Sequence, residues 1–315
     1  MITNNFDIPL PLVTWLLHDS YDHVANEKYI SATQLLRPTK EIVLSHRVKD
    51  TIFNVDVSQY IPSAMGTALH DSIEKAWFET KDFSVLEKLG ISPEITKKIV
   101  VNPEKVNEGD IPIYIEQRAI RELDGWQIGG KFDFIWNGQL YDFKSTSAYT
   151  WVFGKMNDKY CKQGSIYRWL NPDKITSEYI KICFIFTDWN NQLALANKDY
   201  PQCKICYKDI PLMSLEETEG FIKNKLYEIE NYFDKPEEDI PRCSDDDLWR
   251  RDAKYKYYSK ETATRATKVF DTPGEARAYC ASQGKGFVKE VKGEVKRCPM
   301  CPAFTVCKQR GEYFA

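Results

Sequence analysis

An Asn-Gly dipeptide at positions 137–138 constrains this chain more than any other short feature, because it stands between two runs in which apolar and polar residues alternate. Asn-Gly favours the two-residue turn of a β-hairpin, since these residues accept positive φ angles. A two-residue turn also fixes the register of the two strands. The predicted register pairs Trp136 with Gln139, Ile135 with Leu140, Phe134 with Tyr141, and Asp133 with Asp142.

Alternation along the two strands sorts the side chains of this hairpin onto two faces. The aromatic face is the one that we expect to be packed, and it holds Phe132, Phe134, Trp136, Tyr141 and Phe143. The other face holds Lys131, Asp133, Ile135, Leu140, Asp142 and Lys144.

Two aspartates directly opposite each other would destabilise a sheet by up to about 1 kcal/mol, so a counter-charge is expected between them. Carboxylate oxygens are hard ligands that suit Mg²⁺ or Mn²⁺. Lys144 lies two residues beyond Asp142 and therefore projects to the same side, where an anionic substrate or a water would meet it. The alternative is a solvated face on which Lys131 and Lys144 are diagonal partners of the two acids.

The rest of the chain predicts alternating helices and strands. Helices are expected at 65–77, at 150–170, where Asn171-Pro172 ends the helix, and at 215–233. Strands are expected at 111–120 and 178–186, beside the hairpin. This order predicts an α/β fold with a central mixed sheet flanked by helices. We place a boundary near residue 237, between a core with an N-terminal helical part (1–236) and a basic, cysteine-rich segment (237–315).

Charge is divided unevenly along the chain. Residues 251–310 hold 14 Lys and Arg against 6 Asp and Glu, whereas residues 1–250 hold 29 against 39. A basic segment on an acidic body suits a surface for backbone phosphates, although a solvated lysine-rich face would have the same composition.

The sequence holds no run of about 18 apolar residues, so no membrane span or membrane partner is expected. The run Ile8–Leu17 is short, broken by proline and preceded by no basic cluster, unlike a signal peptide. Nine cysteines, an odd number, argue against a fully paired disulfide framework. We expect a reducing compartment, the cytoplasm (or the host cytoplasm for a viral protein), with some cysteines holding metal.

Asp133 followed by Asp142-Phe143-Lys144 resembles the motif of the PD-(D/E)xK nuclease superfamily, although Phe132 stands where that motif has proline. Three further elements occur in the order used by the RecB-like branch of this superfamily. They are Gly66-Thr-Ala-Leu-His70, Glu116 on the strand before the first acid, and Gln163-Gly-Ser-Ile-Tyr167. The resemblance covers roughly residues 28–187 and implies a restriction-endonuclease-like core.

This resemblance also implies roles for individual residues. His70, Asp133, Asp142 and the Phe143 carbonyl would hold Mg²⁺ or Mn²⁺, and Lys144 would orient or deprotonate a water. Glu116, Gln163 and Tyr167 would complete the catalytic set, the last two by positioning the DNA strand. Each residue type also has ordinary structural uses: His70 lies beside an apolar stripe, Glu116 fits the rim of a sheet, and Gln163 and Tyr167 fit helix packing.

The C-terminal segment contains Cys298-Pro-Met-Cys301 followed by Cys307, a spacing that can hold zinc or an iron–sulfur cluster. The spacing resembles that of iron–sulfur relatives of RecB and implies a 4Fe–4S cluster, with Zn²⁺ as the alternative. Those relatives take a fourth cysteine from near the start of the core, where this chain has Arg37 before Pro38. We prefer Cys243 as the fourth ligand, because its segment resembles the one that opens the tail of phage-type RecB-like exonucleases. Cys280 is the alternative.

A second pair, Cys203 and Cys206, has C-x₂-C spacing but falls in an extended stretch. Strand positions three apart point to opposite faces, which disfavours chelation, so we interpret this pair as structural.

Together with these patterns, the resemblance implies a Mg²⁺- or Mn²⁺-dependent deoxyribonuclease, an exonuclease of phage or recombination and repair DNA processing. Its partners would be DNA and phage or host replication and recombination proteins. One alternative is a catalytically weak nuclease-fold protein that binds DNA or a replication partner. Another is a redox or zinc protein, which would leave the opposed aspartates unexplained.

Overall fold

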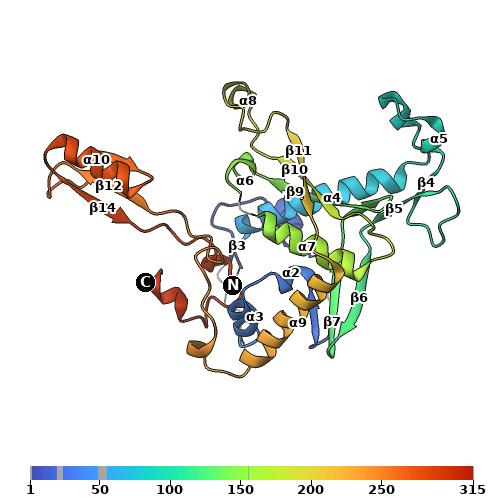
Figure 1. The fold of residues 1–315 in the computed structure, drawn as a ribbon, viewed down its shortest axis with the longest axis horizontal. Coiled ribbons are helices and arrows are strands. Elements are labelled where there is room, and N and C mark those ends of the chain that lie inside the picture. The colour runs from blue at the N-terminus through green and yellow to red at the C-terminus, as the bar shows by residue number, and fades with distance from the viewer. Residues whose placement is uncertain (1, 20–23, 49–54, 155, 315) are drawn as a thin grey trace. The chain divides into compact units, whose positions relative to one another are not determined.

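A computed structural model of the protein describes residues 2–19, 24–48, 55–154 and 156–314. It has an α/β fold with mixed sheets flanked by helices (Figure 1). The chain divides into two compact units, one of residues 1–36 and 52–225 and the other of residues 37–51 and 226–315. No helix among the described residues is both long and apolar enough to cross a membrane.

The first unit is built on a six-stranded mixed sheet and a three-stranded sheet. In the larger sheet the order is β11-β10-β9-β8-β5-β4, with β9–β10 and β4–β5 parallel and the other pairs antiparallel. Its strands are β4 (Ile99–Val101), β5 (Ile111–Ile115), β8 (Phe134–Trp136), β9 (Gln139–Thr146), β10 (Tyr179–Phe186) and β11 (Ile205–Pro211). The smaller sheet has the order β2-β7-β6, from β2 (Tyr29–Ser31), β7 (Trp126–Lys131) and β6 (Arg118–Leu123). A parallel pair joins β1 (Ile2–Thr3) and β3 (Val55–Asp56).

The helices of the first unit confirm two of the three sequence predictions. The helix predicted at 65–77 is α4 (Ile61–Glu79), and the one predicted at 215–233 is α9 (Leu215–Tyr232), which continues into the second unit. The helix predicted at 150–170 is instead two helices, interrupted near Gly154. The helices of this unit besides α4 and α9 are α1 (Leu10–Leu17), α2 (Ala32–Leu35), α5 (Pro93–Thr96), α6 (Ala148–Phe153), α7 (Asn157–Leu170) and α8 (Asn191–Ala196).

The predicted hairpin is present, with Asn137 and Gly138 at φ angles of 45° and 85°. Three of its predicted pairs are confirmed: Phe134–Tyr141, Ile135–Leu140 and Trp136–Gln139. The fourth is not formed, because the ladder ends at Phe134 and Asp133 lies in a bend just before β8. The Asp133 carboxylate instead accepts a hydrogen bond from the Phe143 N–H, at 2.8 Å.

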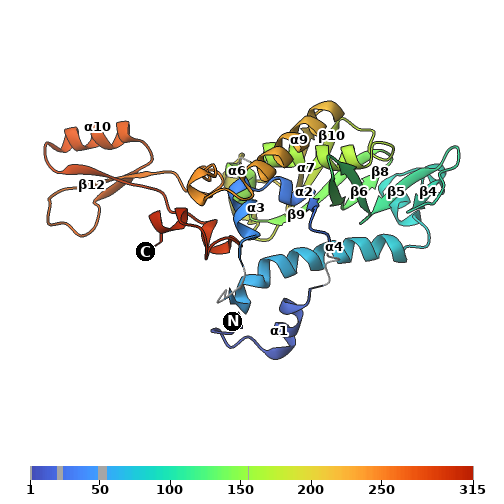
Figure 2. The ribbon, with the colours of Figure 1, turned by 90° about the horizontal axis from the view of Figure 1, so that it is seen from below.

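Both faces of the hairpin are packed, so the predicted packing of the aromatic face is confirmed and the alternative of a solvated second face is excluded. On the aromatic side α4 supplies Trp77, whose ring centroid lies 5.1 Å from that of Phe134. On the other side Asp142 sits beside Ile182 of β10, and both are essentially inaccessible to solvent. Helix α7 covers that side closely, since a Cβ atom at Gly164 would approach Ile180 to 2.9 Å. Figure 2 shows α4 and α7 on opposite sides of the sheet.

The strand predicted at 111–120 is two strands with a bend between them. β5 belongs to the large sheet and β6 to the small one. The chain returns from the small sheet to the large one between β7 and β8, at the same level. The Glu116 N–H donates to the Asp133 carbonyl at 3.0 Å across the bend. Glu116 and Asp133 therefore both lie where two strands leave one sheet for the other.

The second unit combines α3 (Thr39–Ser45) with the C-terminal part of the chain. Thr39 donates a hydrogen bond to Glu228, and Arg297 pairs with Glu41 at 2.7 Å. Val43 and Leu44 pack with Ile240, Ala303 and two cysteines. The second unit thus consists of residues 37–51 together with a C-terminal part that begins at residue 226. The boundary predicted from the sequence lies near residue 237. Its other elements are β12 (Lys254–Tyr258), β13 (Lys268–Phe270), α10 (Pro273–Gln283) and β14 (Phe287–Val291).

Candidate metal centre and its surroundings

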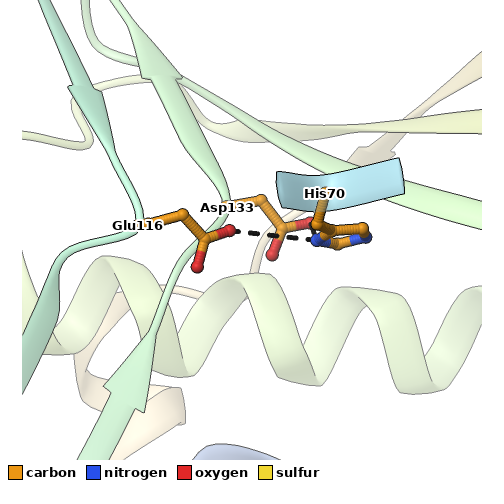
Figure 3. A group of neighbouring side chains, drawn as sticks. All are labelled: His70, Glu116 and Asp133. Carbon is orange, nitrogen blue, oxygen red and sulfur yellow. Dashed lines mark ion pairs between the residues drawn. The ribbon is translucent and has the colours of Figure 1, made fainter. Parts of the chain in front are cut away.

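Three side chains of the first unit converge into a group that could hold a cation: His70, Glu116 and Asp133. One ligand atom of each lies within 4.8 Å of the others. His70 Nδ1 is 3.6 Å from Asp133 Oδ2 and 3.8 Å from Glu116 Oε1. His70 comes from α4, whereas the two acids come from the bend between the sheets, and both carboxylates point toward the imidazole (Figure 3).

Glu116 is held in the left-handed backbone region, at a φ of 51°. Residues other than glycine adopt this region seldom and at a cost of about 1–3 kcal/mol, and such residues cluster at functional sites. The Glu116 carboxylate also forms an ion pair with Lys131, in which Oε2 lies 2.6 Å from Nζ. The bend therefore aims Glu116 at His70 against a local backbone preference.

Protons and a lysine neutralise this group in the structure. The hydrogen bond to Glu116 and the charge of Asp133 raise the pKa of His70 to about 9. Burial, with the charge of Asp142, raises the pKa of Asp133 to about 7. Burial would raise the pKa of Glu116, but hydrogen bonds from His70 and Lys131 outweigh it and lower that pKa. A cation held by these atoms must therefore displace a proton.

The Phe143 carbonyl lies beside the same group. It accepts a hydrogen bond from His70 Nε2 at 2.9 Å, while the N–H of the same residue donates to Asp133. Three of the four predicted cation ligands, His70, Asp133 and Phe143, are thus brought together.

Asp142 and Lys144 form a pair on the α7 side of the sheet. Lys144 Nζ lies 2.5 Å from Asp142 Oδ2, and Asp142 is 1% exposed. Asp142 Oδ1 is buried and finds no hydrogen-bond partner in the part of the chain that the structure describes. Burial would lower the pKa of Lys144, but the charges of Asp142 and Asp133 outweigh it and raise that pKa. Asp142 acts electrostatically on Asp133 without joining the group around His70.

Gln163 and Tyr167 lie on one face of α7, as predicted from their spacing. The Gln163 side-chain amide donates to the Tyr167 hydroxyl at 3.1 Å. Tyr167 packs against the backbone of β7 at Gly130, where a Cβ atom would approach its ring to 2.9 Å. Glycine at that position therefore allows the tyrosine to reach the wall of the pocket described next.

A pocket of about 680 Å³ opens over the metal-binding group. His70, Glu116 and Asp133 line one part of it, together with Tyr167. Sequence analysis missed other lining residues, among them Trp15 and His18 at the end of α1, Tyr60 before α4, and Arg118. Among these, only the position of Arg118 in the sequence indicated a place near the site, since it lies two residues after Glu116. Trp15 belongs to the short apolar run Ile8–Leu17.

The four predicted cysteine ligands lie near one another in the second unit. Burial, with the charges of Asp247, Cys307 and Cys301, raises the pKa of Cys243 to about 12. The charge of Cys307 likewise contributes to the raised pKa values of Cys298 and Cys301, after burial. All four are free thiols, and among the described residues no three cysteine sulfurs lie within 4.8 Å of one another.

Cys280, the alternative fourth ligand, lies in a different environment. Its thiol contacts the carbonyls of Lys285 and Gly286 beside α10. The arrangement therefore favours Cys243 over Cys280 as the neighbour of Cys298, Cys301 and Cys307.

Cys203 and Cys206 are also free thiols, and Cys206 contacts the Cys203 carbonyl at the start of β11.

In metal-free protein, Asp133→Asn is expected to increase stability at about pH 8 by on the order of 1–3 kcal/mol. The pKa of Asp133 is raised from 3.8 to about 7. Its favourable contribution is therefore fully present below 3.8 and is lost as the pH rises through 7, whereas the amide does not titrate. Thermal unfolding in EDTA at several pH values measures the difference. Asp71→Asn, at an exposed carboxylate lining the same pocket, is the control. An equal effect of both variants at every pH would contradict this account.

Comparisons with known proteins leave the family open. No protein-family profile matches the chain. No curated protein sequence matches it either. A solved structure titled "Crystal structure of SSO0001" is similar over 65% of this chain and 78% of that chain, with 18% sequence identity and a TM-score of 0.39. A likeness at that TM-score carries no argument about fold or function.

Proposed function

We propose that this protein is a Mg²⁺- or Mn²⁺-dependent deoxyribonuclease with a restriction-endonuclease-like core, similar to RecB-like PD-(D/E)xK exonucleases. One observation carries the proposal: residues far apart in the sequence, His70, Glu116 and Asp133, meet beside the Phe143 carbonyl in a pocket. All three are residues that the resemblance named, whereas Asp142 and Lys144, which it also named, pair outside this group. Processing of phage DNA, or recombination and repair, is the role that this resemblance implies.

The donor atoms present fit a hard divalent cation. Carboxylates, a backbone carbonyl and an imidazole are donors that Mg²⁺ or Mn²⁺ accepts. We assign His70, Asp133 and the Phe143 carbonyl as ligands, together with Asp142, which lies outside the His70 group in the structure. The uncompensated Asp142 Oδ1 supports including that residue, because a buried carboxylate oxygen without a partner is costly. A bound cation would supply Lewis acidity toward a phosphate oxygen.

The chain's own residues would supply the remaining chemistry. Lys144 carries a positive charge next to Asp142, where it would orient a water and offset negative charge that develops on the scissile phosphate. Glu116 would accept a proton or hold His70 in place. Tyr167, positioned by Gln163, would hold the strand against the pocket wall.

We further propose that Cys243, Cys298, Cys301 and Cys307 hold a 4Fe–4S cluster or Zn²⁺. The support is the chemistry of the donor set, four buried or half-buried thiols in one neighbourhood and none of them in a disulfide. Thiolates are the ligands of both groups. Binding would tie Cys243 to the end of the chain and so add to the stability of the second unit.

Digestion of end-labelled DNA tests the catalytic proposal. Single- and double-stranded substrates are incubated with Mg²⁺, Mn²⁺ or EDTA, and the products are resolved by length. We expect degradation with either metal and none in EDTA. DNA binding without cleavage under every metal would favour the alternative of a catalytically weak DNA- or partner-binding protein, which the burial of Asp142 away from the His70 group would then explain.

A further inference from the structure

The second unit contains a small module, residues 254–292, that the catalytic proposal does not use. Its antiparallel sheet has the order β13-β12-β14. Helix α10 covers one face of this sheet, as Figure 2 shows, with Tyr279 packed against Tyr257 and Phe270 at ring distances of 5.2 Å each. The sheet therefore has a helix-covered face and an opposite face, which we call the open face.

Alternation and register assign the side chains of the open face. Tyr257 points to α10, so its neighbours Lys256 and Tyr258 point away from it. Across the ladder Lys256 lies opposite Lys289, and Tyr258 lies opposite Phe287. Residues on directly paired positions share a face. The open face thus presents two lysines beside two aromatic rings.

The two aromatic rings stack on each other. The rings of Tyr258 and Phe287 are stacked, with centroids 5.4 Å apart and an interplanar angle of 14°, and Phe287 remains 38% exposed. Gly286 allows the backbones of the two strands to approach closely beside these rings, because it has a φ of 84° and a Cβ atom there would lie 2.3 Å from the Tyr258 carbonyl oxygen. A stacked, partly exposed aromatic pair offers a planar surface to another ring.

The charge beside these rings is uncompensated. Directly opposed like charges destabilise a strand pair, and neither Lys256 nor Lys289 forms an ion pair with any residue that the structure describes. The module as a whole holds nine Lys and Arg residues against four Asp and Glu. An anionic partner lying across the two lysines would relieve their repulsion.

We propose that the open face binds single-stranded DNA, with bases stacked on Tyr258 and Phe287 and phosphates at Lys256 and Lys289. Aromatic rings interleaved with lysines are the elements that bind single strands with little sequence preference. A duplex keeps its bases stacked on each other, so it would gain only the charge contacts. This inference goes beyond the proposed hydrolysis, because the surface contains none of the catalytic residues.

Fluorescence anisotropy of a labelled oligothymidylate with the full-length protein in EDTA tests the proposal. Phe287→Ala should weaken binding about 5- to 150-fold, the loss expected for one stacked base. Phe287→Trp should retain it. Lys256→Gln combined with Lys289→Gln should lower the slope of log affinity against log salt by about 1.4. The matched control is Arg277→Gln on α10, which removes a positive charge from the helix side and should leave binding unchanged.

Equal melting temperatures of the variants would establish that they are folded. Wild-type affinity in Phe287→Ala, or an equal loss of affinity for single strands and duplex, would overturn the stacking of bases on these rings. An Arg277→Gln effect as large as that of the double lysine variant would overturn the assignment to this face. EDTA prevents cleavage, so these outcomes do not depend on whether the protein hydrolyses DNA.

Discussion

Replacing Asp142 with Asn, or Lys144 with Met, is expected to reduce Mg²⁺- or Mn²⁺-dependent DNA degradation by on the order of 10³-fold or more. Asp142→Asn would remove the charge of one metal ligand, and Lys144→Met would remove the ammonium group that is proposed to lie next to the scissile phosphate. The measurement is the initial rate of product release from end-labelled DNA, together with thermal unfolding of each variant.

The burial of this pair dictates the design of the experiment. Asp142 is 1% exposed and Lys144 is 28% exposed, so Lys144→Met alone leaves a buried charge without its partner, at a cost of up to about 3–5 kcal/mol. The double variant Asp142→Asn/Lys144→Met removes both charges, so it should be more stable than Lys144→Met and equally inactive. Inactivity in a stable protein then reports chemistry and not unfolding.

A second lysine–aspartate pair on the same sheet provides the control. Lys181 of β10 and Asp209 of β11 are 2.6 Å apart and partly exposed, and the resemblance gives neither of them a catalytic role. The double variant Lys181→Met/Asp209→Asn should keep wild-type activity. Full activity in Asp142→Asn and Lys144→Met would refute the catalytic assignment.

Replacing Cys243 or Cys307 with Ser is expected to abolish binding of the proposed cluster or zinc and to lower the melting temperature of the protein. Structural Zn²⁺ contributes about 10–16 kcal/mol of apparent binding free energy in small metal-dependent domains, so its loss should be a large effect. The pKa values of Cys243 and Cys301 are raised to about 12 and 11. Binding of the cluster or of zinc should therefore release protons and weaken as the pH falls.

Metal analysis and colour identify the bound group. A brown protein prepared without oxygen, with iron and sulfide in equal amounts, indicates an iron–sulfur cluster, whereas a colourless protein with zinc indicates Zn²⁺. Cys280→Ser is the matched control, since its thiol contacts carbonyls beside α10. The assignment would be wrong if Cys280→Ser lost the metal and Cys243→Ser retained it.

Local signals predicted the hairpin correctly. The Asn137-Gly138 turn needs positive φ at both positions, and this requirement alone set the register as far as Phe134. The next pair failed because the chain changes sheets there. A change of sheet depends on long-range pairing, here of Arg118 with Lys131, and alternation within one strand does not reveal it.

Burial was predicted less well than register. The sequence shows an acid and a lysine on one face, Asp142 and Lys144, and polar residues usually face water. Helix α7 covers them nevertheless, because the Ile180 and Ile182 side of β10 is fully apolar and draws the helix over its neighbour β9. Neighbouring strands thus decide the burial of a residue that its own strand would leave exposed.

Helix α3 has a consequence for how the chain is made. Its residues 39–44 are all buried, and two of its partners, Glu228 and Arg297, follow Thr39 and Glu41 by 189 and 256 residues. At about 5–20 residues per second, a ribosome would take roughly 10–50 s to supply them. For that interval the nascent chain carries Ile42, Val43 and Leu44 without their cover, a segment that a chaperone would recognise. A chain that stops at residue 236 would contain Glu228 but would permanently lack Arg297, Ile240 and Ala303, which also cover this segment.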